Sequence, residues 1–191
     1  MNLIFTCGGT GGHINPAIAV ANIMRERHPD ANILFIGAKG HMEEQLVPKA
    51  GFELKCLNVS GLSRGKSFSA IKKNVKTVVD TAKAVSACKK IIRDFKPDVI
   101  LGTGGYACFP ALMAGSMMGI PTCVHESNAI PGLTTKLAEP WADRILICFP
   151  QSAQYYKNPK KVQMVGMPVR SEFIFTKRKK PERSWALTTA L

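Results

Sequence analysis

Short apolar segments alternate along the chain with segments whose apolar positions recur at helical spacing. We expect strands at 2–7, 32–36, 53–57, 98–101, 122–125, 144–148 and 162–165. These strands are near-continuous apolar runs, which is typical of a parallel sheet covered on both faces. The pattern therefore predicts an α/β fold, a Rossmann-like parallel sheet with helices on both faces.

The intervening segments predict helices. They are expected from residue 14 onward and at 42–50, 68–95, 109–118 and 133–138. In the first of them Ile14, Ala17, Ile18 and Ala21 share one face, and Pro16 is expected in the first turn, where its missing N–H costs nothing. After residue 170 the pattern lapses, and 177–181 is basic and ends in proline. We interpret 1–170 as one domain and 171–191 as a linker or tail.

A glycine loop, Gly8–His13, joins the first strand to the first helix. Glycines let backbone N–H groups approach a ligand, and the start of a helix adds partial positive charge, so the loop suits phosphate or a leaving diphosphate. A tight turn that needs glycine for geometry alone is the alternative. A dinucleotide-binding loop is disfavoured because Ile14 stands where its third glycine belongs, and no Gly-Lys-Ser/Thr follows to make a Walker loop.

His13 is a candidate general base, because the positive end of a helix favours the neutral imidazole. A histidine that only hydrogen-bonds the loop is the alternative. Gly102–Tyr106 repeats the strand-to-glycine-to-helix pattern, and His125–Asn128 follows the fifth strand. Since the carboxyl ends of parallel strands meet at one edge, these three segments predict a single site.

Four segments in order carry a resemblance to a known family. They are Gly8-Gly9-Thr10-Gly11-Gly12-His13, Gly104-Gly105-Tyr106, His125-Glu126-Ser127-Asn128 with Pro131-Gly132-Leu133-Thr134, and Gly166-Met167-Pro168-Val169-Arg170. Together they resemble the MurG family of glycosyltransferases from Met1 to about Arg170. The resemblance implies the amino-terminal half of a two-domain GT-B fold, an inverting transferase of peptidoglycan synthesis that needs no metal and no cofactor.

The resemblance also implies substrates and a location. The donor would be UDP-N-acetylglucosamine. The acceptor would be the C4 hydroxyl of lipid I, the N-acetylmuramoyl-pentapeptide carried on undecaprenyl pyrophosphate. The enzyme would sit as a peripheral protein on the cytoplasmic face of the plasma membrane, where transfer yields lipid II.

Site residues are carried over from the matching motifs. Thr10, Gly11 and Gly12 would contact the donor, with Asn128 and Arg170 assisting and Gly104 and Gly105 also binding substrate. His13 would be the base, and Tyr106 and Glu126 would serve the acceptor site. Two departures stand out, since Met167 replaces the family's usual asparagine and the family's second, donor-binding domain has no counterpart in these 191 residues.

The charge is uneven. The net charge is +13, and residues 61–97 hold ten Lys and Arg against two acids, while 157–183 hold nine against two. On the helix expected at 68–95, an apolar stripe predicts packing on the sheet. Its members are Ile71, Val75, Val78, Ala82, Val85 and Ile92.

A basic ridge occupies another side of this helix, where Lys72, Lys76, Lys83 and Lys90 lie within about 40° of each other. Phe68 and Val79 lie between the two stripes. We hypothesise that the ridge docks on an anionic membrane surface, a solvated charged face being the alternative. Nucleic acid is a less favoured partner, because aromatic residues do not interleave with the basic ones.

The six cysteines show no metal-type spacing and are expected to be buried, reduced thiols. No signal peptide is visible, and no apolar run reaches the ~20 residues of a membrane-spanning helix. A second function class stays open. The chain could be a non-catalytic membrane-docking subunit that recruits a separate donor-binding chain.

Overall fold

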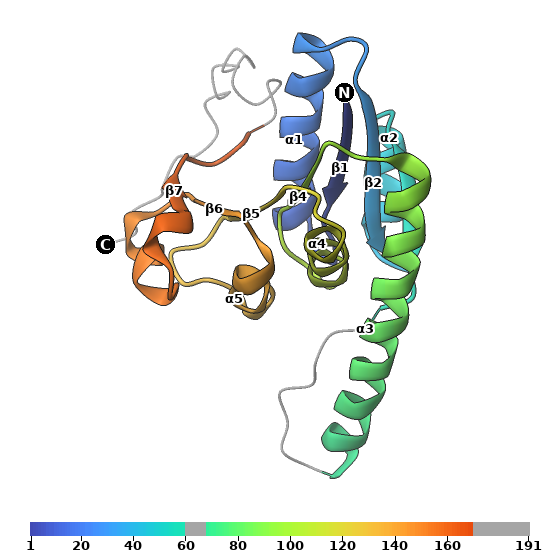
Figure 1. Ribbon diagram of the computed structural model, residues 1–191, viewed down its shortest axis with the longest axis vertical. Coiled ribbons are helices and arrows are strands. Elements are labelled where there is room, and N and C mark those ends of the chain that lie inside the picture. The colour runs from blue at the N-terminus through green and yellow to red at the C-terminus, as the bar shows by residue number, and fades with distance from the viewer. Residues whose placement is uncertain (60–67, 170–191) are drawn as a thin grey trace, which may run out of the picture.

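One parallel sheet organises the protein, in strand order β3-β2-β1-β4-β5-β6-β7. The computed structural model (Figure 1) describes residues 1–59 and 68–169, with the side chains of the long helix given at 77 and from 79 onward. The strands are β1 (Asn2–Thr6), β2 (Asn32–Ala38), β3 (Glu53–Leu57), β4 (Val99–Gly102), β5 (Thr122–Glu126), β6 (Arg144–Ile147) and β7 (Val162–Met164). The predicted fold class is confirmed, and each predicted strand is present within about two residues of its expected ends.

Helices connect the strands. They are α1 (Gly11–Arg27), α2 (Glu43–Lys49), α3 (Phe68–Phe95), α4 (Cys108–Met117) and α5 (Leu133–Ala138), with 3-10 helices η1 (Glu139–Trp141), η2 (Pro150–Tyr155) and η3 (Pro159–Lys161). Because α1 begins at Gly11, Pro16 lies in its second turn, and the first-turn expectation was wrong. The proline has no N–H to donate to the Gly12 carbonyl, so the helix loses one bond there.

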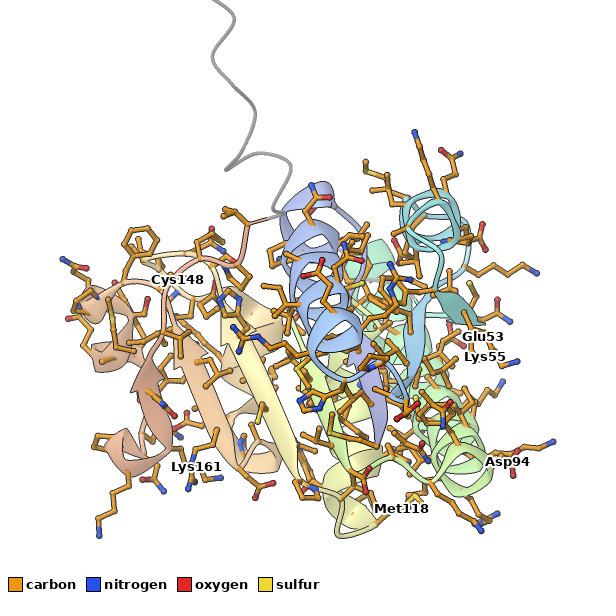
Figure 2. All side chains as sticks on the ribbon, turned by 90° about the horizontal axis from the view of Figure 1, so that it is seen from above. Glu53, Lys55, Asp94, Met118, Cys148 and Lys161 are labelled. Atoms are coloured by element: carbon orange, nitrogen blue, oxygen red, sulfur yellow. The ribbon has the colours of Figure 1, made fainter. Side chains whose placement is uncertain are left out.

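Two hydrophobic cores cover the two faces of the sheet. Leu3 and Phe5 of β1 pack toward α1 and α2, whereas Ile4 between them packs toward α3, α4 and α5. On the first face the ring centroid of Phe35 lies 5.3 Å from that of Phe5 and 5.2 Å from that of Phe52. Burial of each phenylalanine contributes roughly 1.5–3 kcal/mol to the free energy of unfolding. Figure 2 places Glu53 and Lys55 of β3 at one end of the sheet and Lys161 before β7 at the other.

Helix α3 is long, and its amino-terminal half projects past the carboxyl edge of the sheet (Figure 1). Its buried apolar side chains among those described, Ala84, Val85, Cys88 and Ile92, belong to the core shared with α4. The predicted stripe was therefore wrong at Ala82, which is exposed. Small residues such as alanine and cysteine allow close helix packing but weigh little in a hydropathy pattern. The stripe's Ile71, Val75 and Val78 lie outside the described side chains.

Four of the cysteines are buried as predicted, but Cys56 is exposed, because β3 is an edge strand. Burial raises the pKa of the Cys88 thiol to about 12, so this thiol stays protonated at neutral pH. Within the described ranges, no helix combines the length and hydrophobicity that crossing a bilayer requires. The same residues contain no group of three or more potential metal ligands.

Candidate active site

The loops after β1 and β4 meet at the point where the strand order reverses. From β1 the chain continues to β2 and β3 on one side, and from β4 it continues to β5, β6 and β7 on the other. Open α/β sheets bind ligands at such a point, outside the carboxyl ends of the strands. A Cβ on Gly105 would lie 2.6 Å from the carbonyl carbon of Gly8 and closer still to its oxygen. The two loops are therefore in direct backbone contact.

His13 lies in the first turn of α1, and hydrogen bonds fix its ring. Its Nδ1 lies 3.1 Å from the carbonyl oxygen of Gly8 and 3.3 Å from the hydroxyl of Thr10. A carbonyl oxygen can only accept, so Nδ1 carries the proton and the Thr10 hydroxyl accepts from the same N–H. In the neutral ring Nε2 then holds a free lone pair.

This second nitrogen faces Gly104. A Cβ built on Gly104 would lie 2.9 Å from Nε2 and 2.7 Å from Cδ2, so only glycine leaves room for the ring. In the part of the chain that the structure describes, no group hydrogen-bonds Nε2. The backbone carbonyl of His13 accepts from the Thr103 hydroxyl at 2.6 Å, which ties α1 to the loop after β4. The geometry leaves Nε2 able to accept a proton.

A cleft of about 550 Å³ opens beside His13. Six predicted site residues line it, namely Thr10, His13, Gly104, Gly105, Tyr106 and Glu126. Phe109, Pro110, Leu133 and Leu137 form an apolar part of its wall, and α3 contributes Thr77 and Thr81. The lining of the cleft thus contains both polar residues and an apolar part that can accept an apolar group.

Tyr106 and His41 form a pair of rings on the cleft, with centroids 6.0 Å apart. Tyr106 is 45% exposed, so its hydroxyl is accessible to a ligand. His41 was not among the predicted site residues. It follows β2 in a short polar turn, and nothing in the local pattern distinguishes it from a solvated surface histidine.

Glu126 is buried at the end of β5, and both carboxylate oxygens are engaged. Oε1 accepts from the backbone N–H and the side-chain amide of Asn128, each at 2.8 Å. Oε2 accepts from the Gly132 N–H at 2.9 Å and from the Thr135 hydroxyl. The carboxylate therefore shapes the loop from β5 to α5, and contact with an acceptor stays a prediction.

The remaining predicted residues lie elsewhere. Gly11 and Gly12 are the first two residues of α1, and neither lines the cleft. Within residues 1–59 and 68–169 nothing accepts a hydrogen bond from their N–H groups. Asn128 is also absent from the lining, since its amide is committed to Glu126. Arg170 lies outside the described residues. Two free N–H groups at a helix start remain available to an anion.

His125 precedes Glu126 in β5, but it lines a different cavity and is not part of the cleft lining. Its Nε2 lies 3.3 Å from the Gly166 carbonyl oxygen and 3.2 Å from Cys148 Sγ, and its Nδ1 lies 3.4 Å from the Ser127 hydroxyl. Burial lowers the pKa of His125, opposed by the Gly166 carbonyl and by Glu126. A cavity of about 340 Å³ lies beside it, and its walls include Val165, Met167 and Pro168.

Glu43 supports the glycine loop of the site, although it does not line the cleft, and sequence reasoning missed it. Its side chain is fully buried, although it comes from the first turn of α2. Oε2 accepts from the Gly9 N–H at 3.1 Å, and Oε1 accepts from the Ala38 N–H at 2.8 Å. Its neighbour Glu44 is exposed, and the sequence offers no signal that separates the two acids.

The chain belongs to glycosyltransferase family 28. The family's N-terminal domain matches residues 3–147, which contain the cleft and both glycine loops. The similarity extends to curated relatives. One from Alkaliphilus oremlandii is 44% identical over 174 residues, 91% of this chain and 46% of the relative. Another from Bacillus cytotoxicus is 41% identical over 188 residues, 98% of this chain and 50% of the relative.

Both relatives are named UDP-N-acetylglucosamine–N-acetylmuramyl-(pentapeptide) pyrophosphoryl-undecaprenol N-acetylglucosamine transferase. The chain spans about half the length of these relatives. Among solved structures, MurG from Acinetobacter baumannii superposes with a TM-score of 0.70 at 21% identity, covering 89% of this chain and 46% of that one. A UDP-GlcNAc 2-epimerase from Neisseria meningitidis gives 0.62 at 17% identity, covering 88% and 47%. These likenesses concern the fold alone.

Proposed function

We propose that this chain supplies the acceptor-side half of an inverting N-acetylglucosaminyltransferase of peptidoglycan synthesis. The donor is UDP-N-acetylglucosamine, and the acceptor is the C4 hydroxyl of lipid I. The names of the relatives support these substrates. The observation that carries the proposal is His13, whose Nδ1 is bonded to Gly8 while its Nε2 faces a cleft with one apolar wall.

In the proposed reaction Nε2 of His13 takes the proton of the acceptor hydroxyl. The hydroxyl oxygen forms a bond to the anomeric carbon of the sugar as the bond from that carbon to the diphosphate oxygen breaks, which inverts the configuration. UDP leaves with an additional negative charge. The free N–H groups of Gly11 and Gly12 and the positive end of α1 stabilise that charge.

The reaction needs a second domain that binds the donor on the opposite side of the cleft. The relatives are about twice as long as this chain, and we propose that their other half binds the uridine and closes over α1. Apolar side chains follow β7 where such a domain would attach. Val165, Met167 and Val169 are 43–46% exposed, and the first two line the cavity beside His125. Residues 1–170 then form the acceptor domain, and residues 171–191 continue as a linker or tail.

We also propose that the protein sits peripherally on the cytoplasmic face of the plasma membrane. The amino-terminal half of α3 projects past the edge that carries the cleft (Figure 1), and Thr77 and Thr81 of α3 line the cleft. Lys83, Lys90 and Val79 are exposed on α3, whereas the side chains of Phe68, Lys72 and Lys76 lie outside the described residues. Each basic residue near an anionic bilayer contributes ~1 kcal/mol of binding.

A chimera tests the transfer step. Residues 1–170 are joined to the second half of the Alkaliphilus oremlandii relative, and transfer to a lipid I analogue is measured. We expect the chimera to transfer sugar and the isolated chain to be inactive. His13→Ala in the chimera should slow transfer by about 10²–10⁴-fold, the contribution of a general base. His28→Ala, at an exposed histidine, is the matched control. Equal rates for the two variants would contradict the proposal, as would activity of the isolated chain.

Vesicle co-sedimentation tests the membrane surface. Lys72, Lys76, Lys83 and Lys90 are replaced by glutamate, and binding to vesicles with anionic lipid should be lost. The control replaces four exposed lysines elsewhere, Lys39, Lys49, Lys157 and Lys160, which changes the net charge equally. Equal loss of binding in both variants would show that total charge, and not α3, drives association.

A further inference from the structure

We propose that Glu43 is a positioning residue that acts on His13 through the peptide group between Gly8 and Gly9. This peptide donates its N–H to Glu43 Oε2 at 3.1 Å and accepts at its carbonyl oxygen from His13 Nδ1 at 3.1 Å. Carboxylate, peptide and imidazole therefore form one continuous chain of hydrogen bonds. The importance of these linked hydrogen bonds for catalysis rests on the proposed role of His13. The hydrogen bonds themselves do not depend on that role.

The carboxylate is held in place independently of His13. Its other oxygen accepts from the Ala38 N–H at 2.8 Å, which anchors Glu43 to the end of β2. Two glycines make room for the side chain. A Cβ on Gly8 would lie 2.7 Å from Oε1, and a Cβ on Gly37 would lie 2.6 Å from Cγ of Glu43. Both strand ends are thus shaped around a buried anion.

A carboxylate polarises the peptide to which it is bonded. When the Gly9 N–H donates to the carboxylate, electron density in the peptide shifts toward the Gly8 carbonyl oxygen, which becomes a stronger acceptor because hydrogen bonds in a chain reinforce one another. The carbonyl then holds the proton on Nδ1 of His13 more firmly. In catalytic triads a carboxylate fixes the histidine tautomer by direct contact, and here one peptide group would transmit the same effect.

The consequence is chemical. A neutral imidazole exists in two tautomers, and only the one with the proton on Nδ1 has a free lone pair on Nε2. If Nε2 carried the proton, it would face Gly104 and the cleft as a donor and could not take a proton from a hydroxyl. Glu43, acting through the Gly8 carbonyl, therefore strengthens the preference for the tautomer that can act as a base.

The test is the tautomer of His13 in the isolated, ¹⁵N-labelled chain, read from long-range ¹H–¹⁵N correlations of the imidazole at a pH where the ring is neutral. We expect the unsubstituted chain to hold the proton on Nδ1. In Glu43→Gln the amide can accept from only one of the two N–H groups, and the tautomer protonated on Nε2 should rise several-fold. Glu44→Gln, an exposed acid in the same helical turn, should leave the spectrum unchanged.

A second variant keeps the test decisive if Glu43→Gln does not fold. Gly8→Ala places a methyl group against Oε1 and displaces the carboxylate without removing its charge. It should change the tautomer in the same direction. A folded variant of either kind with the original tautomer would overturn the proposal, and so would an unsubstituted chain protonated on Nε2.

Kinetics in the chimera separate positioning from general destabilisation. Glu43→Gln should lower kcat and leave KM for both substrates unchanged. In a His13→Ala background the same substitution should cause no further loss, because its effect passes through the imidazole. An additive loss would overturn the proposal. An inactive chimera would contradict the proposed function instead, and the spectra alone would then decide the role of Glu43.

Discussion

The loops after β1 and β4 read alike in sequence but use their glycines differently. In the loop after β4 the space of each missing side chain is occupied. Cys108 and Leu112 fill it at Gly102, the His13 ring fills it at Gly104, and the backbone of Gly8 fills it at Gly105. In the loop after β1, Glu43 fills the space at Gly8, but among the described residues a Cβ on Gly12 would meet only the Thr10 hydroxyl, at 3.8 Å.

This difference assigns different tasks to the two loops. Glycines after β4 allow close packing between protein segments and build a wall for the cleft. Gly11 and Gly12 leave their N–H groups open at the start of α1, where an anion can approach. A glycine-rich sequence alone does not distinguish these uses, because only the neighbouring segments decide whether the space is filled.

The largest effect is expected from Gly105→Ala. The new methyl group would overlap the backbone of Gly8, and φ at this position is +89°. Overpacking and backbone strain together should lower the free energy of unfolding by about 2–6 kcal/mol, measured by urea denaturation. Gly119→Ala is the control, because φ is +73° but none of the described residues lies within 4 Å of the new Cβ. Equal losses in the two variants would mean that strain alone matters and that the loops do not pack tightly.

A smaller effect is expected from Gly104→Ala, which tests the contact between the two loops. Its methyl group would lie 2.7 Å from Cδ2 of His13, so the ring must move. Because φ at Gly104 is +105°, backbone strain adds to this overpacking, and we expect a loss of about 2–4 kcal/mol in unfolding free energy and slower transfer in the chimera. In a His13→Ala background the ring is absent, and Gly104→Ala should then cost less. A full additive cost there would contradict the proposed contact.

Gly12→Ala should separate stability from function. Alanine fits at this helical position and should stabilise the protein by about 0.5–1 kcal/mol. The added methyl group next to two open N–H groups should hinder a diphosphate and lower kcat/KM for the donor about tenfold, or ~1.4 kcal/mol. Thermal unfolding and donor kinetics in the chimera measure the two effects. An unchanged kcat/KM would remove Gly12 from the donor site.

The sheet could be predicted from the sequence because each strand is a near-continuous apolar run, and Figure 1 shows the resulting parallel order. The edge of the sheet that carries the site could also be predicted, since polar and glycine-rich segments follow β1, β4 and β5. Glu43 could not be predicted in this way. Whether it or Glu44 is buried depends on how α2 packs against β2 and β3, and on the hydrogen bond that Gly9, 34 positions away in the chain, donates to Glu43. The buried face of α3 was partly wrong for the same reason, because α4 selects Ala84 and Cys88.

The smallest effect concerns His125 near the end of β5, which is buried, whereas His13 lines the cleft. The pKa of His125 is lowered below its ordinary value of 6.5, with burial the largest cause. The unfolded chain therefore binds this proton more readily than the folded protein. Stability is fully present above about pH 6.5 and is lost as the pH falls toward the lowered value in the folded state. We expect the thermal midpoint to fall between pH 7.5 and pH 5.5, and to fall less in His125→Gln. An equal decline in the variant would mean that other groups cause the acid sensitivity and that His125 does not differ from a solvated histidine.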